Sequence, residues 1–259
     1  MAKIGEIYEF LNSLAPFETQ DSFDNSGLLV GDKNLEATRV LLAMDATPEA
    51  INEAKRLGCN LLVTHHPVIF NGIKALTPEL PAYMLLNNGI SCISAHTNLD
   101  CAEYGISDIM CDLLGFENIH QLVDANRKDK DGNEVGYGAV GTCSEMTPES
   151  LAMLCKQVFK TNGLRYVAGN RTIKKVAMIS GAGGDFWWHA SKLGADAYIT
   201  ADVKHHQFLD AHSAGLTLID AGHHETEVVA MPYLQKVLSE RFGDTEFLVS
   251  QLEYCVKSI

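Results

Sequence analysis

Apolar positions along the chain alternate between short continuous runs and helical spacings, and this rhythm predicts an α/β protein. Continuous apolar runs predict buried strands, and apolar residues three or four apart predict helices. In the first half, strands are predicted at 40–44, 61–64 and 90–95, and helices at 1–16, 48–57, 80–88 and 106–114. In the second half, strands are predicted at 136–142, 176–180, 197–200 and 216–220, and helices at 148–159, 186–193 and 228–242. This order favours largely parallel or mixed sheets faced by helices.

A charged segment interrupts the pattern near the middle of the chain. Residues 124–134 read DANRKDKDGNE and contain an Asp-Gly turn signal. We interpret them as a surface loop or hairpin between two halves. The predicted organisation is therefore 1–123 as a first α/β half, to which the C-terminal segment returns, 124–135 as a charged loop, and 136–259 as a second α/β half.

The two halves repeat a common sequence plan. AKRLGCNLLVT at 54–64 matches ASKLGADAYIT at 190–200, a separation of 136 residues. The runs at 40–46 and 89–96 match those at 176–182 and 215–223 in the same order. Three matches in one order indicate an internal duplication.

Composition narrows the class of protein. The 259 residues are 46% hydrophobic and carry a formal net charge of −13, which disfavours a nucleic-acid partner. A nucleic-acid binder that threads strands through a ring is the least favoured function considered. The sequence shows no apolar run of membrane-spanning length and no signal peptide, so no membrane association is expected. The seven cysteines form no CxxC pair and are expected to be core thiols in a reducing, cytoplasmic protein.

Histidines and carboxylates gather where predicted strands end. His65 and His66 directly follow the strand at 61–64, and Pro67 then stops the strand. In open α/β sheets, ligands bind beyond the carboxyl ends of the strands. Adjacent histidines in a turn can face two sides of one pocket, which suits two neighbouring metal ions.

Two further strand ends carry the same chemistry. The segment after 90–95 contains His96 and Asp100, and the segment after 216–220 contains His223 and Glu227. His223 and Glu227 share one face if a helix begins near residue 223. Asp100 or Glu227 is the natural bridge between two ions, because a carboxylate has two oxygens. Independent structural histidines would not be expected to recur at equivalent points of a duplicated unit.

Two other clusters have weaker functional signals. Asp202 is a candidate to orient a ligand histidine, and His205 is a candidate proton carrier. The alternative is that His205, His206 and His212 lie on a solvated helix. The glycine-rich run 181–184 resembles a phosphate-binding turn, but it lacks the full motif and is better interpreted as a tight strand-to-helix connection.

Several of these segments together resemble one known family, the GTP cyclohydrolase 1 type 2 homologs, also called the NIF-three-like family. The segments are FDNSGLLVG at 23–31, THHP at 64–67, HTNLD at 96–100, GADAYIT at 194–200 and DAGHHETE at 220–227. The resemblance implies two α/β domains with a dinuclear metal site in the cleft between them. It implies that the metal ligands are His65, His66, Asp100, His223 and Glu227.

The resemblance also implies a homohexamer, a trimer of dimers, and the compact form without an inserted middle domain. One departure is Phe23, where a Trp is common before Asp-Asn. This exchange of aromatic residues is expected to affect packing more than chemistry.

The site chemistry favours a metal-dependent hydrolase with a small-molecule substrate. Two divalent ions of Zn, Fe, Mn, Co or Ni, which the ligands do not distinguish, would activate water for cyclohydrolase-type, phosphoester or amide hydrolysis. His96 is the expected proton carrier of this reaction. A nucleotide is one candidate substrate. The alternative is a non-catalytic metal-binding scaffold or regulatory protein, and open coordination positions would separate the two.

Overall fold

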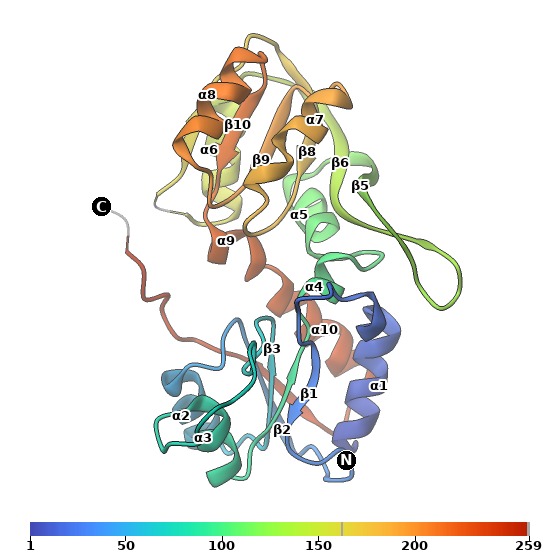
Figure 1. Ribbon diagram of the computed structural model, residues 1–259, viewed down its shortest axis with the longest axis vertical. Coiled ribbons are helices and arrows are strands. Elements are labelled where there is room, and N and C mark those ends of the chain that lie inside the picture. Colours follow the sequence, from blue (N-terminus) through green and yellow to red (C-terminus); the bar gives the residue numbers. More distant parts are fainter. Residues whose placement is uncertain (162, 258–259) are drawn as a thin grey trace. The chain divides into compact units, whose positions relative to one another are not determined.

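The structure is a computed structural model that describes residues 1–161 and 163–257. It divides into two compact units (Figure 1). The first contains residues 1–103 and takes back the segment 230–253. The second contains residues 104–229 and the C-terminal residues from Tyr254. Residues 104–123, placed with the first half by the sequence, therefore pack with the second unit.

The first unit is built on a five-stranded sheet in the order β1-β4-β3-β2-β11. Its strands are β1 (Gly27–Val30), β2 (Arg39–Ala43), β3 (Leu61–Thr64), β4 (Ser91–Ser94) and β11 (Glu246–Val249). Strands β11, β2, β3 and β4 run parallel, and β1 pairs antiparallel with β4. All residues of β3 and β4 are buried, which explains why the apolar residues of β3 follow one another without alternating polar positions.

Helices cover both faces of this sheet. They are α1 (Ile4–Leu14), α2 (Pro48–Leu57), α3 (Pro81–Asn87), α4 (Thr97–Asp100) and α10 (Ala230–Arg241), with a 3₁₀ turn η1 (Phe17–Thr19). Helices α2 and α3 lie on one face, and α1 and α10 on the other (Figure 1). The predicted ends of α2 are confirmed. Thr47 Oγ1 accepts a hydrogen bond from the Ala50 amide at 3.2 Å, and Gly58 has a φ of 71°.

The second unit contains a six-stranded sheet in the order β5-β6-β8-β9-β10-β7. The strands are β5 (Glu117–Lys128), β6 (Glu134–Met146), β7 (Arg165–Val167), β8 (Ile173–Met178), β9 (Ala197–Thr200) and β10 (Thr217–Asp220). Strands β8, β9 and β10 are parallel, and the other pairings are antiparallel. The charged segment forms the outer part of the β5–β6 hairpin, but this hairpin lies within the second unit and not between two halves as the sequence predicted. Both units match the predicted α/β class with mixed sheets.

The helices of this unit are α5 (Ile106–Leu114), α6 (Pro148–Val158), α7 (Trp187–Lys192), α8 (His205–Ser213) and α9 (His223–Glu227), with a 3₁₀ turn η2 (Gly184–Phe186). In Figure 1, α7 and α8 cover one face of the sheet, and α5 and α6 cover the other. Among the described residues, no helix combines the length and apolar character needed to cross a membrane.

The strand registers reproduce the repeat seen in the sequence. In the first unit Val40 of β2 pairs with Leu61 of β3, and in the second Val176 of β8 pairs with Ala197 of β9. Both members of the second pair lie 136 positions after their counterparts. The same parallel pairing at the same spacing fits a duplicated strand–helix–strand unit.

The cysteines were predicted to be core thiols, and most of them are buried in the structure. Five thiols are buried, those of Cys59, Cys92, Cys101, Cys111 and Cys155. Cys143 is half-buried and Cys255 is exposed. Burial raises the pKa of Cys92 and Cys155 to about 12, so these thiols stay protonated and unreactive near neutral pH.

Candidate metal centre

The paired histidines extend from the carboxyl end of β3. The His65 and His66 amides donate to the carbonyls of Ala43 and Met44, so the strand pairing continues past β3. The His65 side chain is fully buried. Its Nδ1 lies 2.9 Å from the Ala95 carbonyl, which can only accept a hydrogen bond. Nδ1 therefore carries the proton, and Nε2 is the nitrogen that can ligate a cation.

Carboxylates orient the two neighbouring histidines in the same way. His66 Nδ1 donates to Asp45 Oδ1 at 2.8 Å, and His96 Nδ1 donates to Asp24 Oδ1 at 2.8 Å. A carboxylate on Nδ1 fixes the ring and makes Nε2 a better ligand. This arrangement is typical of metal-binding histidines.

The first unit thus holds a compact group of donors. Ligand nitrogens of His65, His66 and His96 all lie within 4.8 Å of one another. Asp100, at the end of α4, places Oδ2 3.9 Å from His65 Nε2. Ions such as zinc bind nitrogen and oxygen at about 2.0–2.2 Å, so one ion can span this pair. The donor set fits a divalent cation.

Asp24 is the most extensively bonded carboxylate of this group. Its side chain is fully buried. Besides His96, it accepts hydrogen bonds from Ser26 Oγ and from both the amide and the hydroxyl of Thr97. Burial by itself would raise the pKa of Asp24, but the hydrogen bonds from His96 and Thr97 hold it well below its ordinary value. Asp24 therefore stays ionised and fixes the His96 ring.

The second unit has its own imidazole and carboxylate donors on α9. The helix does begin at His223, and the i,i+4 spacing brings His223 Nε2 to 3.1 Å from Glu227 Oε2. His223 Nδ1 donates to Asp202 Oδ2 at 2.8 Å, so the orienting role predicted for Asp202 has its contact. The Glu227 carboxylate, with Asp202 acting in the same direction, raises the pKa of His223 to about 9 although burial opposes this. A divalent cation can take the place of that proton.

A glycine makes room for the Glu227 carboxylate. Gly181, after β8, has a φ of +58°, and a Cβ there would lie 2.0 Å from Glu227 Oε1. The Gly181 amide also donates to Thr226 Oγ1 at 3.0 Å, which fixes α9. A Cβ at Gly183 would lie 2.5 Å from Thr200 Oγ1. The glycine run is therefore required for close packing, in line with the prediction of a tight connection.

The other histidines considered as functional candidates are exposed to solvent. His205, His206 and His212 are exposed on α8, as expected for a solvated helix. His212 Nδ1 is hydrogen-bonded to the Ala168 carbonyl at 2.9 Å. These positions give no structural support for His205 as a proton carrier.

The sequence did not assign roles to Asp24 and Asp45. Asp45 comes just after β2, in the same position relative to its strand as the histidines after β3. Asp24 lies in an irregular segment before β1, and its contact with His96 spans 72 positions. A strand-end search would have found Asp45. No local pattern marks Asp24.

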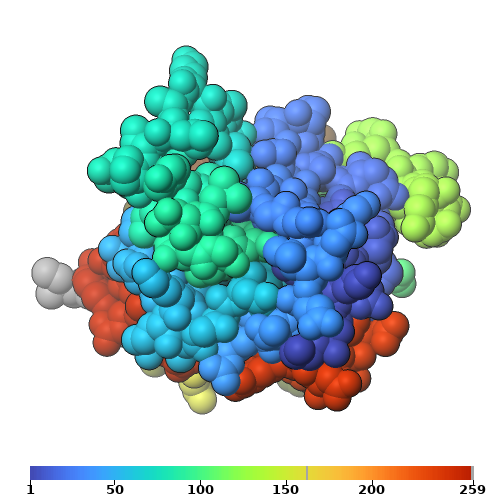
Figure 2. Space-filling view, turned by 90° about the horizontal axis from the view of Figure 1, so that it is seen from below, coloured from blue at the N-terminus to red at the C-terminus, as the bar shows by residue number. Residues whose placement is uncertain are grey.

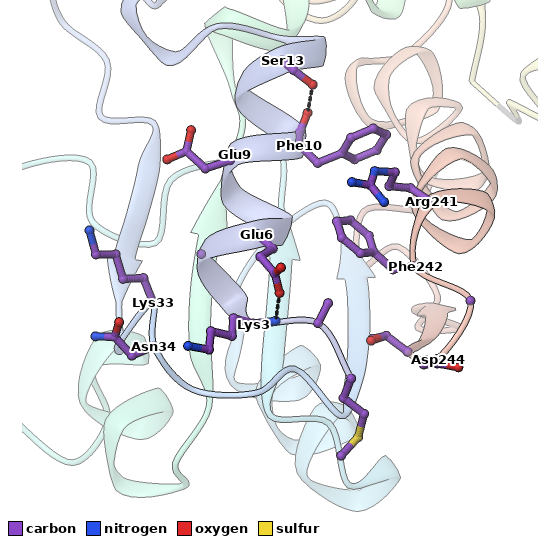
Figure 3. Close-up of a pocket in the computed structure, with 15 residues that line it drawn as sticks. Lys3, Glu6, Glu9, Phe10, Ser13, Lys33, Asn34, Arg241, Phe242 and Asp244 are labelled. Atoms are coloured by element: carbon purple, nitrogen blue, oxygen red, sulfur yellow. Dashed lines mark hydrogen bonds between the residues drawn. The ribbon is translucent and has the colours of Figure 1, made fainter.

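A hollow of about 900 Å³ lies elsewhere in the first unit, beside α1 and the end of α10 (Figure 3). Its lining mixes basic and acidic side chains, namely Lys3, Lys33, Arg241, Glu6, Glu9 and Asp244. Glu6 already accepts a hydrogen bond from the Lys3 amide at 2.6 Å. Because basic and acidic side chains are mixed and Glu6 is already hydrogen-bonded within the chain, this lining favours neither an anionic nor a cationic ligand.

Comparison with known proteins identifies the family of this chain. A family model described as Duf34/NIF3 (NGG1p interacting factor 3) matches residues 2–255. The chain belongs to this family. Among curated NIF3 relatives, the GTP cyclohydrolase 1 type 2 homolog of Clostridium perfringens is 36% identical over 256 residues, covering 96% of each chain. That of Clostridium acetobutylicum is 34% identical, again over 96% of each chain.

Solved structures of NIF3 relatives have the same fold. A Staphylococcus aureus hypothetical protein is 30% identical, with a TM-score of 0.89 over 99% of each chain. A Bacillus cereus protein related to NIF3 gives a TM-score of 0.91 at 24% identity, covering 100% of this chain and 99% of that one. Reduced HcgD from Methanocaldococcus jannaschii gives 0.82 at 29% identity, covering 96% and 98%. The resemblance inferred from the sequence motifs is therefore confirmed.

Proposed function

We propose that this NIF3-family protein binds two divalent metal ions through His65, His66, Asp100, His223 and Glu227. One observation carries the proposal. Every histidine of the set has its Nδ1 committed to a carboxylate or carbonyl oxygen, at 2.8–2.9 Å. Each ring therefore presents Nε2 toward a neighbouring donor, as ligand histidines do.

The proposal requires the donors of both units to serve one dinuclear centre. The resemblance to the family implies these same five positions as the ligand set. Carboxylates provide the oxygen ligands, and Asp100 or Glu227 would bridge the ions. The mix of imidazole and carboxylate accepts Zn, Fe, Mn, Co or Ni.

The reaction that fits this donor set is hydrolysis of a small molecule, a nucleotide or a small phosphoester. Bound divalent ions would lower the pKa of water toward neutrality and polarise the bond to be cleaved. The chain itself supplies the proton transfer. Asp24 holds the Nδ1 proton of His96 in place, so His96 Nε2 is the atom that takes up or delivers a proton. We further propose a cytoplasmic homohexamer that binds neither nucleic acid nor membrane.

The test combines metal analysis with turnover. Anaerobically purified protein should contain about two divalent ions per chain, and a Glu227→Ala variant should contain fewer. Metal-loaded protein should hydrolyse GTP or members of a phosphoester panel faster than the Glu227→Ala variant. If the protein binds metal but shows no turnover above that control, the non-catalytic scaffold function is favoured over the hydrolase. If the protein contains no bound metal after incubation with zinc, manganese and iron, the proposal of a metal site is refuted. Sedimentation equilibrium checks the hexamer.

A further inference from the structure

Two aromatic rings are exposed together beside the histidine group of the first unit. Phe23 is 62% exposed and Phe70 is 46% exposed, and their ring centroids lie 6.4 Å apart. Most of the Phe23 residue therefore faces solvent and not the core. Exposed neighbouring aromatic rings are costly and are a common feature of binding surfaces. In Figure 2 the segment leading from β3 to α3, which carries Phe70, stands out from the surface (teal).

Hydrogen bonds fix the two segments that carry these rings. Asp24, next to Phe23, is fixed by its bonds to His96 and Thr97. Asn25 Nδ2 donates to the Ile69 carbonyl at 2.6 Å, which ties the segment of Phe23 to the residue before Phe70. The segments that carry both rings are therefore tied together before a ligand binds, and preformed surfaces lose little entropy on binding. We call Phe23 and Phe70 the aromatic platform.

The aromatic platform is continuous with the candidate metal centre. The Phe70 ring centroid lies 6.3 Å from that of His96, and the two rings meet edge to face. His96 in turn lies 5.1 Å from His65 and 5.4 Å from His66 between ring centroids. A ligand that covers the platform would therefore place one edge beside His96 and within reach of the metal ligands.

We propose that the aromatic platform binds a planar heteroaromatic ring of the substrate, such as a nucleobase, by stacking. This deepens the proposed function and rests on it. The planes of the two phenyl rings are tilted by 44°, so a flat ring can stack on one of them and contact the edge of the other, while its polar edge pairs with His96. A protein partner fits less well, because it would cover the polar Nε2 edge of His96 with an apolar contact without supplying a polar partner.

The experiment measures equilibrium binding to zinc-loaded, full-length protein by calorimetry. The probes are guanosine 5′-monophosphate and ribose 5-phosphate, which differ by the base. The wild type should bind the nucleotide more tightly than the sugar phosphate. Phe23→Leu and Phe70→Leu should each weaken nucleotide binding about tenfold and leave sugar phosphate binding unchanged. Phe23→Trp should bind the nucleotide at least as tightly as the wild type.

Tyr83→Leu is the matched control, since Tyr83 is an exposed aromatic residue of the same unit, 36% exposed on α3, and should not alter binding. Zinc content is measured for every variant. Equal nucleotide affinity in wild type and both leucine variants overturns the proposal. So does a change in sedimentation without a change in nucleotide affinity, which would make the platform a protein interface. Base-dependent binding without turnover leaves the platform standing while the hydrolase fails, so the two failures are distinguishable.

Discussion

The contact between Asp202 and His223 gives the sharpest test of the metal centre. Asp202 Oδ2 accepts the Nδ1 proton of His223 at 2.8 Å, and Nε2 of the same ring lies 3.1 Å from Glu227. Asp202→Asn keeps the size of the side chain and removes its charge. Asp202 has a φ of 51°, a conformation that Asn adopts readily, so this substitution adds little backbone strain. The variant should fold as the wild type does and should differ from it only in the contact between residue 202 and His223.

The expected effect is about a tenfold loss of metal affinity, or about 1.4 kcal/mol. Loss of a residue that orients a metal-binding histidine typically costs about 10–100-fold. The Asp202 side chain is 58% exposed and His223 is 31% exposed, so water screens the lost charge and places the effect at the low end. Asp45→Asn should behave similarly, since Asp45 is 46% exposed beside His66.

The assay is zinc competition against a fluorescent chelator at one fixed pH. Glu227→Ala should cause the largest loss of affinity, because it removes a proposed ligand. Asp210→Asn, an exposed carboxylate of α8 in the same unit, should bind zinc as the wild type does. If Asp202→Asn matches the wild type while Glu227→Ala loses a site, Asp202 does not orient a ligand and the argument from Nδ1 contacts is refuted.

Three further outcomes are expected. Asp24→Asn should lower the free energy of unfolding by about 3 kcal/mol at pH 7. Because folding lowers the pKa of Asp24, that difference should shrink as the pH falls below about 4, which urea titrations at several pH values will detect. Gly181→Ala should cost about 1–2 kcal/mol of stability and weaken zinc binding, as its Cβ would displace Glu227; unchanged thermal unfolding and affinity would contradict this. A thiol reagent should label Cys255 first in the native protein, and Cys255→Ser should remove the fast phase.

Local patterns in the sequence fixed most of the regular elements. The predicted ends of α2 match the structure because Thr47, Pro48 and Gly58 act through bonds within one turn. Strands β3 and β9 were found because burial on both faces leaves continuous apolar runs. The short strands β1, β7 and β11 were missed, since strands of three or four residues lack enough pattern to distinguish them from loops.

The sequence also determined which residue types the site contains, because paired histidines and an i,i+4 His–Glu pair stand out at strand ends. Only the tertiary structure decided which atoms face a ligand. The Asp24–His96 contact joins residues 72 positions apart, and the aromatic platform joins Phe23 to the segment after β3. Such contacts depend on how strands are ordered in the sheet, which no local spacing records. The sequence predicted that the C-terminal segment returns to the first half, but only the structure gives the bounds of that segment, residues 230–253, since packing rather than chain order selects the partner of α10.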